Sequence, residues 1–389
     1  MQTCRLCVLF IPFILLINIF SLNAEASELR EDIDTFRDDQ NHYSSDIMYA
    51  VFSLDEVLYE NYEGTDENVV FEWGSITKLL TWVSVMQLVE QEEIDLDEDI
   101  TNYLPDDLLR DFEYDTPVTM IDLMNHQAGF QEYIPNLFVE ELPDDYSLED
   151  AVQDNQPFQY HEPGEVTVYS NWGAALAGLI VEEVSGLPFH EYVHENILEP
   201  LDMNNTALAP DLSDNDSVRS SADNFYTGSS NNDTHWYMPL YPAGSAVSTL
   251  PDLITFGQAL FPSNTDTPLF DNVNTLVSMF EATDHYEDTD IPRYAHGFQV
   301  SLLDNTVYGH RGNTNLFSSN LLLDIEEGTG YAVMTNETQD TTYALLFPET
   351  VFGDYTRPDD FEDFTPADIS QFYQPVPAFV QGAAVSFNP

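Results

Sequence analysis

Ser75 and Lys78 are the two residues of this sequence whose types and spacing point most directly to chemistry. Lys78 is the only lysine among 389 residues, and it stands three positions after the serine. Side chains at i and i+3 of a helix share one face, so the amine can reach the hydroxyl. A serine hydroxyl is a weak nucleophile until a neighbouring base takes its proton, and a lysine in an apolar setting can act as that base. The pair therefore predicts a serine nucleophile with its base close by.

The segment 75–90 predicts the element that carries this pair. Almost every position is apolar, which is typical of a helix buried on all sides. A lysine on such a helix is costly unless it is paired or used. Because Ser75 would lie at the N-terminus of this helix, its backbone N–H would stand where negative charge is favoured.

Tyr169-Ser170-Asn171 comes directly before a second predicted helix, over 171–184. Small residues in that helix suit close packing, and Gly186 is placed to end it. Tyr169 can act as a second proton carrier, and Asn171 can orient a substrate amide. A tyrosine at such a position is more often a core residue than a catalytic one. A catalytic role for Tyr169 therefore depends on the other motifs of the chain.

His310-Arg311-Gly312 lies on a predicted strand, and Gly312 would let a substrate approach the strand backbone closely. Strands are predicted at 47–53, 56–62, 298–303, 306–310, 316–323 and 329–335. The short connections between the last four require antiparallel pairing. We therefore expect an α/β (α+β) fold, in which an antiparallel sheet is flanked by helices and a mainly helical region, 97–239, is inserted.

The order Ser-x-x-Lys, Tyr-x-Asn and His-x-Gly resembles the serine β-lactamase and penicillin-binding superfamily. The likeness is to the branch that holds class C β-lactamases, D,D-carboxypeptidases, D-aminopeptidases and β-lactamase-fold esterases. It extends over residues 47–336. Similar segments are 71–78, 97–105, 118–130 with its Leu123, His126 and Gly129, 169–203, 243–256 and 309–319.

The resemblance implies a β-lactamase/transpeptidase-like fold and a role for each motif residue. Ser75 would be the acylated nucleophile, with Lys78 and Tyr169 as the proton-transfer pair. The substrate-binding residues would be Asn171, His310, Arg311, Gly312 and Asn313. Among these, the backbone N–H groups of Ser75 and Asn313 would form the oxyanion hole. The family often has Thr, Ser or Gly where Arg311 stands, so this arginine either clamps a substrate carboxylate or faces solvent.

His190-Glu191-Tyr192-Val193-His194 matches H-E-x-x-H, the helical motif of zinc proteases. No third ligand follows at the spacing of the extended motif, since Ile197 and Pro200 stand there. A dedicated calcium loop is also disfavoured, because 95–100 lacks the glycine that an EF-hand needs at its sixth position. We expect no cofactor and no catalytic metal, and a zinc hydrolase remains the minor alternative.

The N-terminus reads as a signal peptide over 1–26, with an apolar run and Ala24-Glu25-Ala26 as the cleavage site. We therefore expect a secreted, cell-surface or periplasmic protein, attached to a membrane only if the leader stays uncleaved. Both cysteines lie in this leader, so the mature chain would have no disulfide. The hydrolase domain would span 27–350, followed by an acidic and then uncharged tail over 351–389.

The formal net charge is −61, with 70 acidic and 9 basic residues spread along the chain. Such a charge excludes nucleic acid as a partner and predicts adaptation to high salt. The expected partner is a small-molecule or peptide substrate, such as a D-amino-acid peptide, a β-lactam, a small ester or a peptidoglycan fragment. The competing function is a ligand-binding or sensor module on the same fold that does not turn over.

Overall fold

The computed structural model describes residues 29–40, 45–131, 137–143, 146–228, 236–286 and 289–356. The predicted leader and nearly all of the predicted tail lie outside these ranges. Within them, no helix has the length and apolar character needed to cross a membrane.

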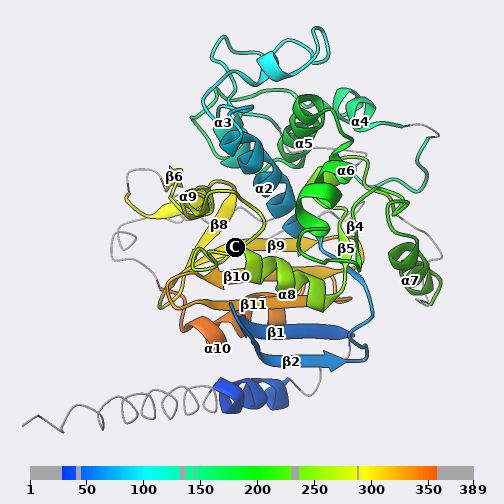
Figure 1. Ribbon diagram of the computed structural model, residues 1–389, viewed down its shortest axis with the longest axis vertical. Coiled ribbons are helices and arrows are strands. Elements are labelled where there is room, and N and C mark those ends of the chain that lie inside the picture. Colours follow the sequence, from blue (N-terminus) through cyan, green and yellow to red (C-terminus); the bar gives the residue numbers. More distant parts are fainter. Residues whose placement is uncertain are drawn as a thin grey trace, which may run out of the picture.

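One eight-stranded antiparallel sheet forms the base of the molecule (Figure 1), with the strand order β2-β1-β11-β10-β9-β8-β7-β6. The predicted sheet of first and last strands is thereby confirmed. Two short strands at its far edge, β6 and β7, were not predicted. The bounds are β1 Ile47–Ser53, β2 Val57–Glu63, β6 Asp284–His285, β7 Pro292–Ala295, β8 Phe298–Leu302, β9 Thr306–Asn313, β10 Ser318–Asp324 and β11 Thr329–Thr335.

Both faces of this sheet are covered by other parts of the protein. For this reason almost all residues of β1 are buried. Successive side chains of a strand point to opposite faces. Met48, Ala50 and Phe52 join the large core that includes α8 (Leu250–Ala259). Ile47, Tyr49 and Val51 join a second, smaller core on the other face. Residues 29–39, which are helical, and α10 (Phe347–Phe352) close that second core.

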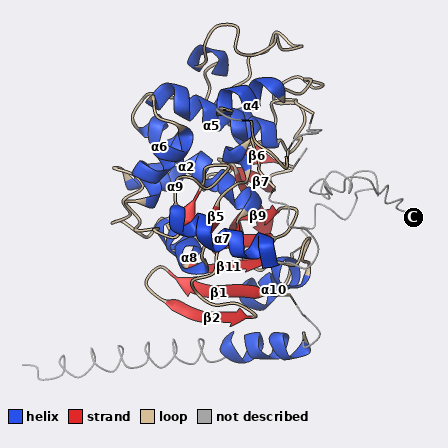
Figure 2. Cartoon of the chain, turned by 90° about the vertical axis from the view of Figure 1, so that its right-hand side faces the viewer, coloured by secondary structure: helices blue, strands red, loops and turns tan. Residues whose placement is uncertain are grey.

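The helical region lies at one end of the sheet (Figure 2), and two of its helices carry the predicted motifs. The helix α2 (Thr77–Glu90) is buried along nearly its whole length, as its composition predicted. It packs against α5 (Asn171–Ser185), which ends at Gly186 with φ +73°, again as predicted. The remaining helices are α3 Met120–Met124, α4 Leu148–Asp154, α6 Phe189–Val193, α7 Asp216–Gly228 and α9 Val273–Ser278.

A second sheet of three very short strands was not predicted. Its order is β3-β5-β4, with β3 Phe71–Glu72, β4 Thr206–Ala207 and β5 Val247–Ser248. β3 immediately precedes the segment of Ser75, and β5 follows the loop at 243–246. This small sheet therefore fixes both segments beside each other.

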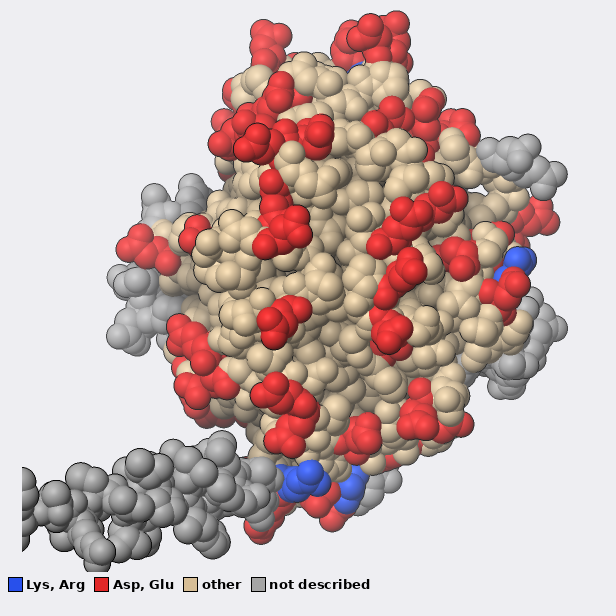
Figure 3. Space-filling model, viewed as in Figure 1, with Lys and Arg blue, Asp and Glu red and all other residues tan. Residues whose placement is uncertain are grey.

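Acidic side chains are scattered over the face of the molecule that Figure 3 shows, whereas basic side chains appear at few points. The ion pairs among the described residues involve Arg37 with Asp34 and Asp38, and Arg293 with Asp284. Most surface carboxylates are thus surrounded by other carboxylates and solvent.

Candidate active site

Ser75 lies in a single 3₁₀ turn, η1 (Gly74–Ile76), that leads directly into α2. The turn begins at Gly74, whose φ of +51° is in the left-handed region that favours glycine. A side chain there would also collide with the protein, because its Cβ would lie 2.9 Å from the backbone nitrogen of Asn313. The serine turn and the end of β9 are therefore in direct contact.

Lys78 is fully buried, and its amine reaches three oxygen atoms. Its Nζ lies 3.1 Å from Ser75 Oγ, 2.7 Å from Asn171 Oδ1 and 2.7 Å from the carbonyl oxygen of Ala243. The amide oxygen of Asn171 and the carbonyl of Ala243 can only accept hydrogen bonds. In a neutral amine, these two oxygens take both N–H groups, so the lone pair is left facing Ser75. The geometry thus suits removal of the serine proton.

Tyr169 and Asn171 both contact this lysine, one at each side of Ser170. The Nζ atom of Lys78 lies 4.8 Å from the centre of the Tyr169 ring. Asn171 is the first residue of α5 and is 4% exposed. Its side chain therefore orients Lys78, a contact that the sequence did not predict, since Asn171 was expected to hold the substrate.

His126 holds the segment that carries Tyr169 through both its backbone and its side chain. The sequence indicated His126 only as part of 118–130, a segment that resembles the β-lactamase and penicillin-binding superfamily. Its carbonyl oxygen accepts from the Val168 N–H (2.7 Å), and its Nδ1 accepts from the Ser170 N–H (3.2 Å). Its ring centre lies 4.5 Å from that of Tyr169. His126 also has φ +56°, a left-handed conformation that histidine and asparagine adopt more readily than most residues. We therefore consider His126 a positioning residue for Tyr169.

Replacing His126 by leucine should slow acylation of Ser75 by about 10², because a small displacement of a reacting group can cost that much. His126→Asn should keep most of the rate, since its Oδ1 can replace Nδ1 as acceptor and asparagine tolerates the left-handed backbone. The measurement is the rate of labelling by a fluorophosphonate, together with the melting temperature.

Asn125→Ala is the matched control for this experiment. Asn125 is buried in the same loop, but its side chain bonds to Thr283 instead of the Tyr169 segment. Its loss should lower stability and leave the labelling rate close to that of the wild type. Wild-type labelling by His126→Leu would show that His126 does not position Tyr169.

His310 lies on β9 at the other side of Tyr169, with ring centres 5.9 Å apart. Its Nδ1 is 2.6 Å from the carbonyl oxygen of Arg311, which can only accept, so Nδ1 carries the proton. Nε2 consequently presents a lone pair. Burial, reinforced by the positive charge of Lys78, lowers the pKa of His310 to about 3. The imidazole is therefore neutral over the usual range of pH.

Arg311 does not reach this site, although the sequence placed it among the substrate-binding residues. It is paired with Asn320 of β10, and residues paired across an antiparallel ladder point to the same face. The side chain of Asn320 donates to the carbonyl of Ala344, on the face covered by α10. Arg311 accordingly lies in the fields of Asp340 and Tyr355, and burial lowers its pKa.

Gly312 permits a close approach, but the group that approaches is part of the protein. A Cβ at Gly312 would lie 1.9 Å from the carbonyl oxygen of Trp73. The hydroxyl of Ser319, paired with Gly312, donates to the same carbonyl at 2.7 Å. Gly312 therefore brings β9 against the serine turn, and so places Asn313 beside it.

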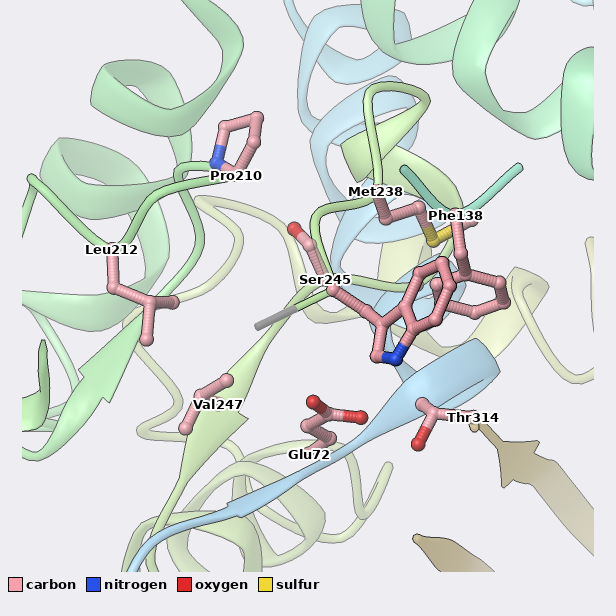
Figure 4. Close-up of a pocket in the computed structure, with 10 residues that line it drawn as sticks. Glu72, Phe138, Pro210, Leu212, Met238, Ser245, Val247 and Thr314 are labelled. Atoms are coloured by element: carbon pink, nitrogen blue, oxygen red, sulfur yellow. The ribbon is translucent and has the colours of Figure 1, made fainter. Parts of the chain in front are cut away.

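A small pocket opens next to the serine turn, and Figure 4 shows the side chains around it. It is bordered by Glu72, three positions before Ser75, and by Thr314, which follows Asn313. The other lining residues are uncharged: Phe138, Pro210, Leu212, Trp236, Met238, Gly244, Ser245 and Val247. The carboxylate of Glu72 points into the space between Ser245, Val247 and Thr314. The pocket is a suitable place for one arm of a substrate.

The H-E-x-x-H segment lies on α6 and the π-helical turn that follows it (His194–Leu198). Glu191 and His194 are exposed, and His190 is half-buried against Tyr241. In the described part of the chain, no three or more His, Cys, Asp or Glu side chains gather in a way that could hold a metal ion.

Comparisons with known proteins agree with this arrangement. The chain is 27% identical over 145 residues to penicillin-binding protein 4* of Bacillus subtilis, a match that covers 36% of this chain and 31% of that protein. It is also 27% identical over 153 residues to a putative D-alanyl-D-alanine carboxypeptidase of Salmonella agona, covering 37% of this chain and 35% of that protein. The chain spans only 31–42% of the length of the first curated relatives it matches.

Among solved structures, the D-amino acid amidase of Ochrobactrum anthropi SV3 matches with a TM-score of 0.65 and 21% identity. The match covers 84% of this chain and 97% of that protein, and at this identity it shows a common fold. The family model described as Beta-lactamase matches residues 40–347, a range that contains the Ser75 turn, Tyr169 and β9. By this match the chain belongs to the β-lactamase family.

Proposed function

We propose that this protein is a serine hydrolase that cleaves an amide or ester through an acyl-enzyme on Ser75. The observation that carries the proposal is the position of Lys78 Nζ, 3.1 Å from the serine hydroxyl. Two acceptor-only oxygens, of Asn171 and Ala243, hold that amine in place. A base fixed in this way can activate serine without a histidine.

The reaction would proceed in two halves. Ser75 Oγ attacks the carbonyl carbon while its proton passes to the Lys78 amine. The bond to the leaving group then breaks, and the leaving nitrogen or oxygen takes a proton from the pair of Lys78 and Tyr169. Water attacks the resulting ester, gives up its proton to the same pair, and returns Ser75 to its hydroxyl form.

The negative oxygen of each tetrahedral intermediate would be stabilised by backbone N–H groups of Ser75 and Asn313. The contact between Gly74 and the Asn313 nitrogen supports this pairing, because it brings the two backbone segments together. Loss of one such donor in serine hydrolases typically costs about 10²–10³ in rate.

The natural setting belongs to the same proposal. The apolar N-terminal run and Ala24-Glu25-Ala26 support export to the cell surface, periplasm or medium. The charge of −61 supports work in concentrated salt. The names of the relatives, a penicillin-binding protein and a putative D-alanyl-D-alanine carboxypeptidase, support peptides or peptidoglycan fragments as candidate substrates.

Covalent labelling tests the proposal and separates it from a sensor function. In molar salt, a fluorophosphonate should label the wild type, and Ser75→Ala should abolish labelling. Release of a fluorescent ester-derived acyl group should follow within minutes. Labelling that survives in Ser75→Ala would refute the mechanism, while an acyl group that is never released would favour the sensor.

A further inference from the structure

We infer that the site selects amides and esters that carry no carboxylate near the scissile bond. The inference rests on the proposed acyl-enzyme at Ser75 and narrows its substrates. It follows from three features. His310 on β9 presents a lone pair, Arg311 lies on the opposite face of the sheet, and the carboxylate of Glu72 lies in the adjoining pocket.

The Tyr169 side of the site has an acceptor where a carboxylate would need a donor. The proton of His310 is on Nδ1, which is engaged with the carbonyl of Arg311, so Nε2 presents its lone pair. This Nε2 is buried and makes no hydrogen bond to any described residue. The lone pair of His310 Nε2 and the oxygens of a carboxylate repel each other. His310 in this tautomer therefore favours a neutral substrate group that can donate a hydrogen bond.

The pocket side has a negative charge. Glu72 is the charged residue among those that line the pocket, and its carboxylate points inward (Figure 4). An anionic substrate arm would be brought beside this carboxylate, which disfavours binding and contributes to specificity. A neutral or cationic arm meets no such repulsion.

The described basic residues give no compensating charge. Arg311 faces the α10 side of the sheet, and Arg293 is paired with Asp284. Of the other described arginines, Arg30 and Arg37 contact β2, Arg110 donates to the carbonyl of Gln156, and Arg219 acts on Asp211. Lys78 is fully buried, its two N–H groups are taken by Asn171 and Ala243, and as the neutral base that faces Ser75 it carries no charge. A carboxylate next to the scissile bond would therefore lose its hydration without gaining a charged partner.

Two pairs of activated esters test this specificity, each pair differing in one carboxylate. 4-Acetoxybenzoate and its methyl ester differ in the leaving group. 4-Nitrophenyl hydrogen adipate and 4-nitrophenyl methyl adipate differ in the acyl group. The value of kcat/KM, divided by the rate of spontaneous hydrolysis, should be about tenfold or more higher for the neutral member of each pair.

The results separate failure of the substrate preference from failure of the proposed function. Equal or faster cleavage of the carboxylate esters would overturn the inference while leaving the acyl-enzyme intact. If neither pair is cleaved faster by the wild type than by Ser75→Ala, the proposed function itself fails. The expected preference for neutral esters should persist at both low and high activating salt, because the repelling groups are buried or lie in a pocket.

Two variants test which residue causes the preference for neutral esters. Glu72→Gln should reduce the preference severalfold in the pair whose carboxylate enters the pocket. Arg311→Gln is the matched control: it removes a charge one residue from His310, but on the other face of β9, and should leave both preferences unchanged. A change in preference with Arg311→Gln, in protein of unchanged melting temperature, would show that Arg311 reaches the substrate and would contradict the inference.

Discussion

Replacing Lys78 by glutamine should reduce the rate of Ser75 acylation by a factor on the order of 10³, the usual scale of general-base catalysis. Glutamine can still donate a hydrogen bond towards the carbonyl of Ala243, but its amide cannot take the serine proton. The effect should appear in the pre-steady-state rate of labelling by a fluorophosphonate, measured in molar salt and at several values of pH.

Thr81→Val is the matched control for Lys78→Gln. Thr81 is buried one turn further along α2, and its hydroxyl donates to the carbonyl of Pro242, next to Ala243. The change removes a buried hydrogen bond of the same helix and loop, at a cost of about 1–2 kcal/mol in the free energy of unfolding. Labelling should stay within a few fold of the wild type. If Lys78→Gln also labels normally, another group, such as Tyr169, must take the first proton.

The second large effect that we expect is that the protein folds cooperatively only in concentrated salt. With 70 acidic and 9 basic residues, repulsion acts across the whole surface. The Debye length is about 10 Å at 0.1 M salt and about 3 Å at 1 M, so only the higher concentration screens neighbouring carboxylates. We expect loss of the cooperative thermal transition near the lower concentration and its return near the higher one, measured by circular dichroism and labelling of Ser75.

An uncharged osmolyte separates screening from a general effect of excluded solutes. Sucrose favours compact states without screening charge, so it should restore less of the transition than sodium chloride of equal osmolality. Full folding and labelling in salt-free buffer would refute the halophilic interpretation. Recovery by sucrose equal to that by salt would assign the effect to solute exclusion.

Mild acid should be a poor substitute for salt, because of two buried histidines. Burial, aided by the charge of Lys78, lowers the pKa of His126 well below its ordinary value, and that of His310 to about 3. In the unfolded chain each would have a pKa of about 6.5. Their contribution to stability is therefore complete above pH 6.5 and declines as the pH falls towards the folded values. This loss opposes any gain from protonating surface carboxylates.

Much of the site could be predicted from the sequence because its chemistry depends on local spacing. Ser75 and Lys78 are on adjoining turns of one apolar segment, and α5 was evident from its small residues and Gly186. The sheet followed from period-two strands with short connections. Each of these signals lies within about twenty residues, which is the range over which sequence patterns are informative.

Other parts depend on contacts that no local pattern records. The carbonyl of Ala243 supports Lys78, yet a backbone carbonyl has no residue type to read. The strands β3, β4 and β5 have two residues each, too few to show a period. His126 acts through its backbone as well as its ring. Arg311 is a different case: on a strand it must face away from its neighbour His310, so the two could not both line the site.

The position of β1 determines when this protein can complete its fold. This strand from the start of the domain pairs with β11, so that Ile47 lies opposite Thr335. The main sheet is continuous only when β1 is in place between β2 and β11. Contacts so distant in sequence form slowly, since a long loop must close first. A ribosome that still holds residues 329–335 therefore also holds the sheet open, and the main sheet cannot close until β11, the last strand among the described residues, has emerged.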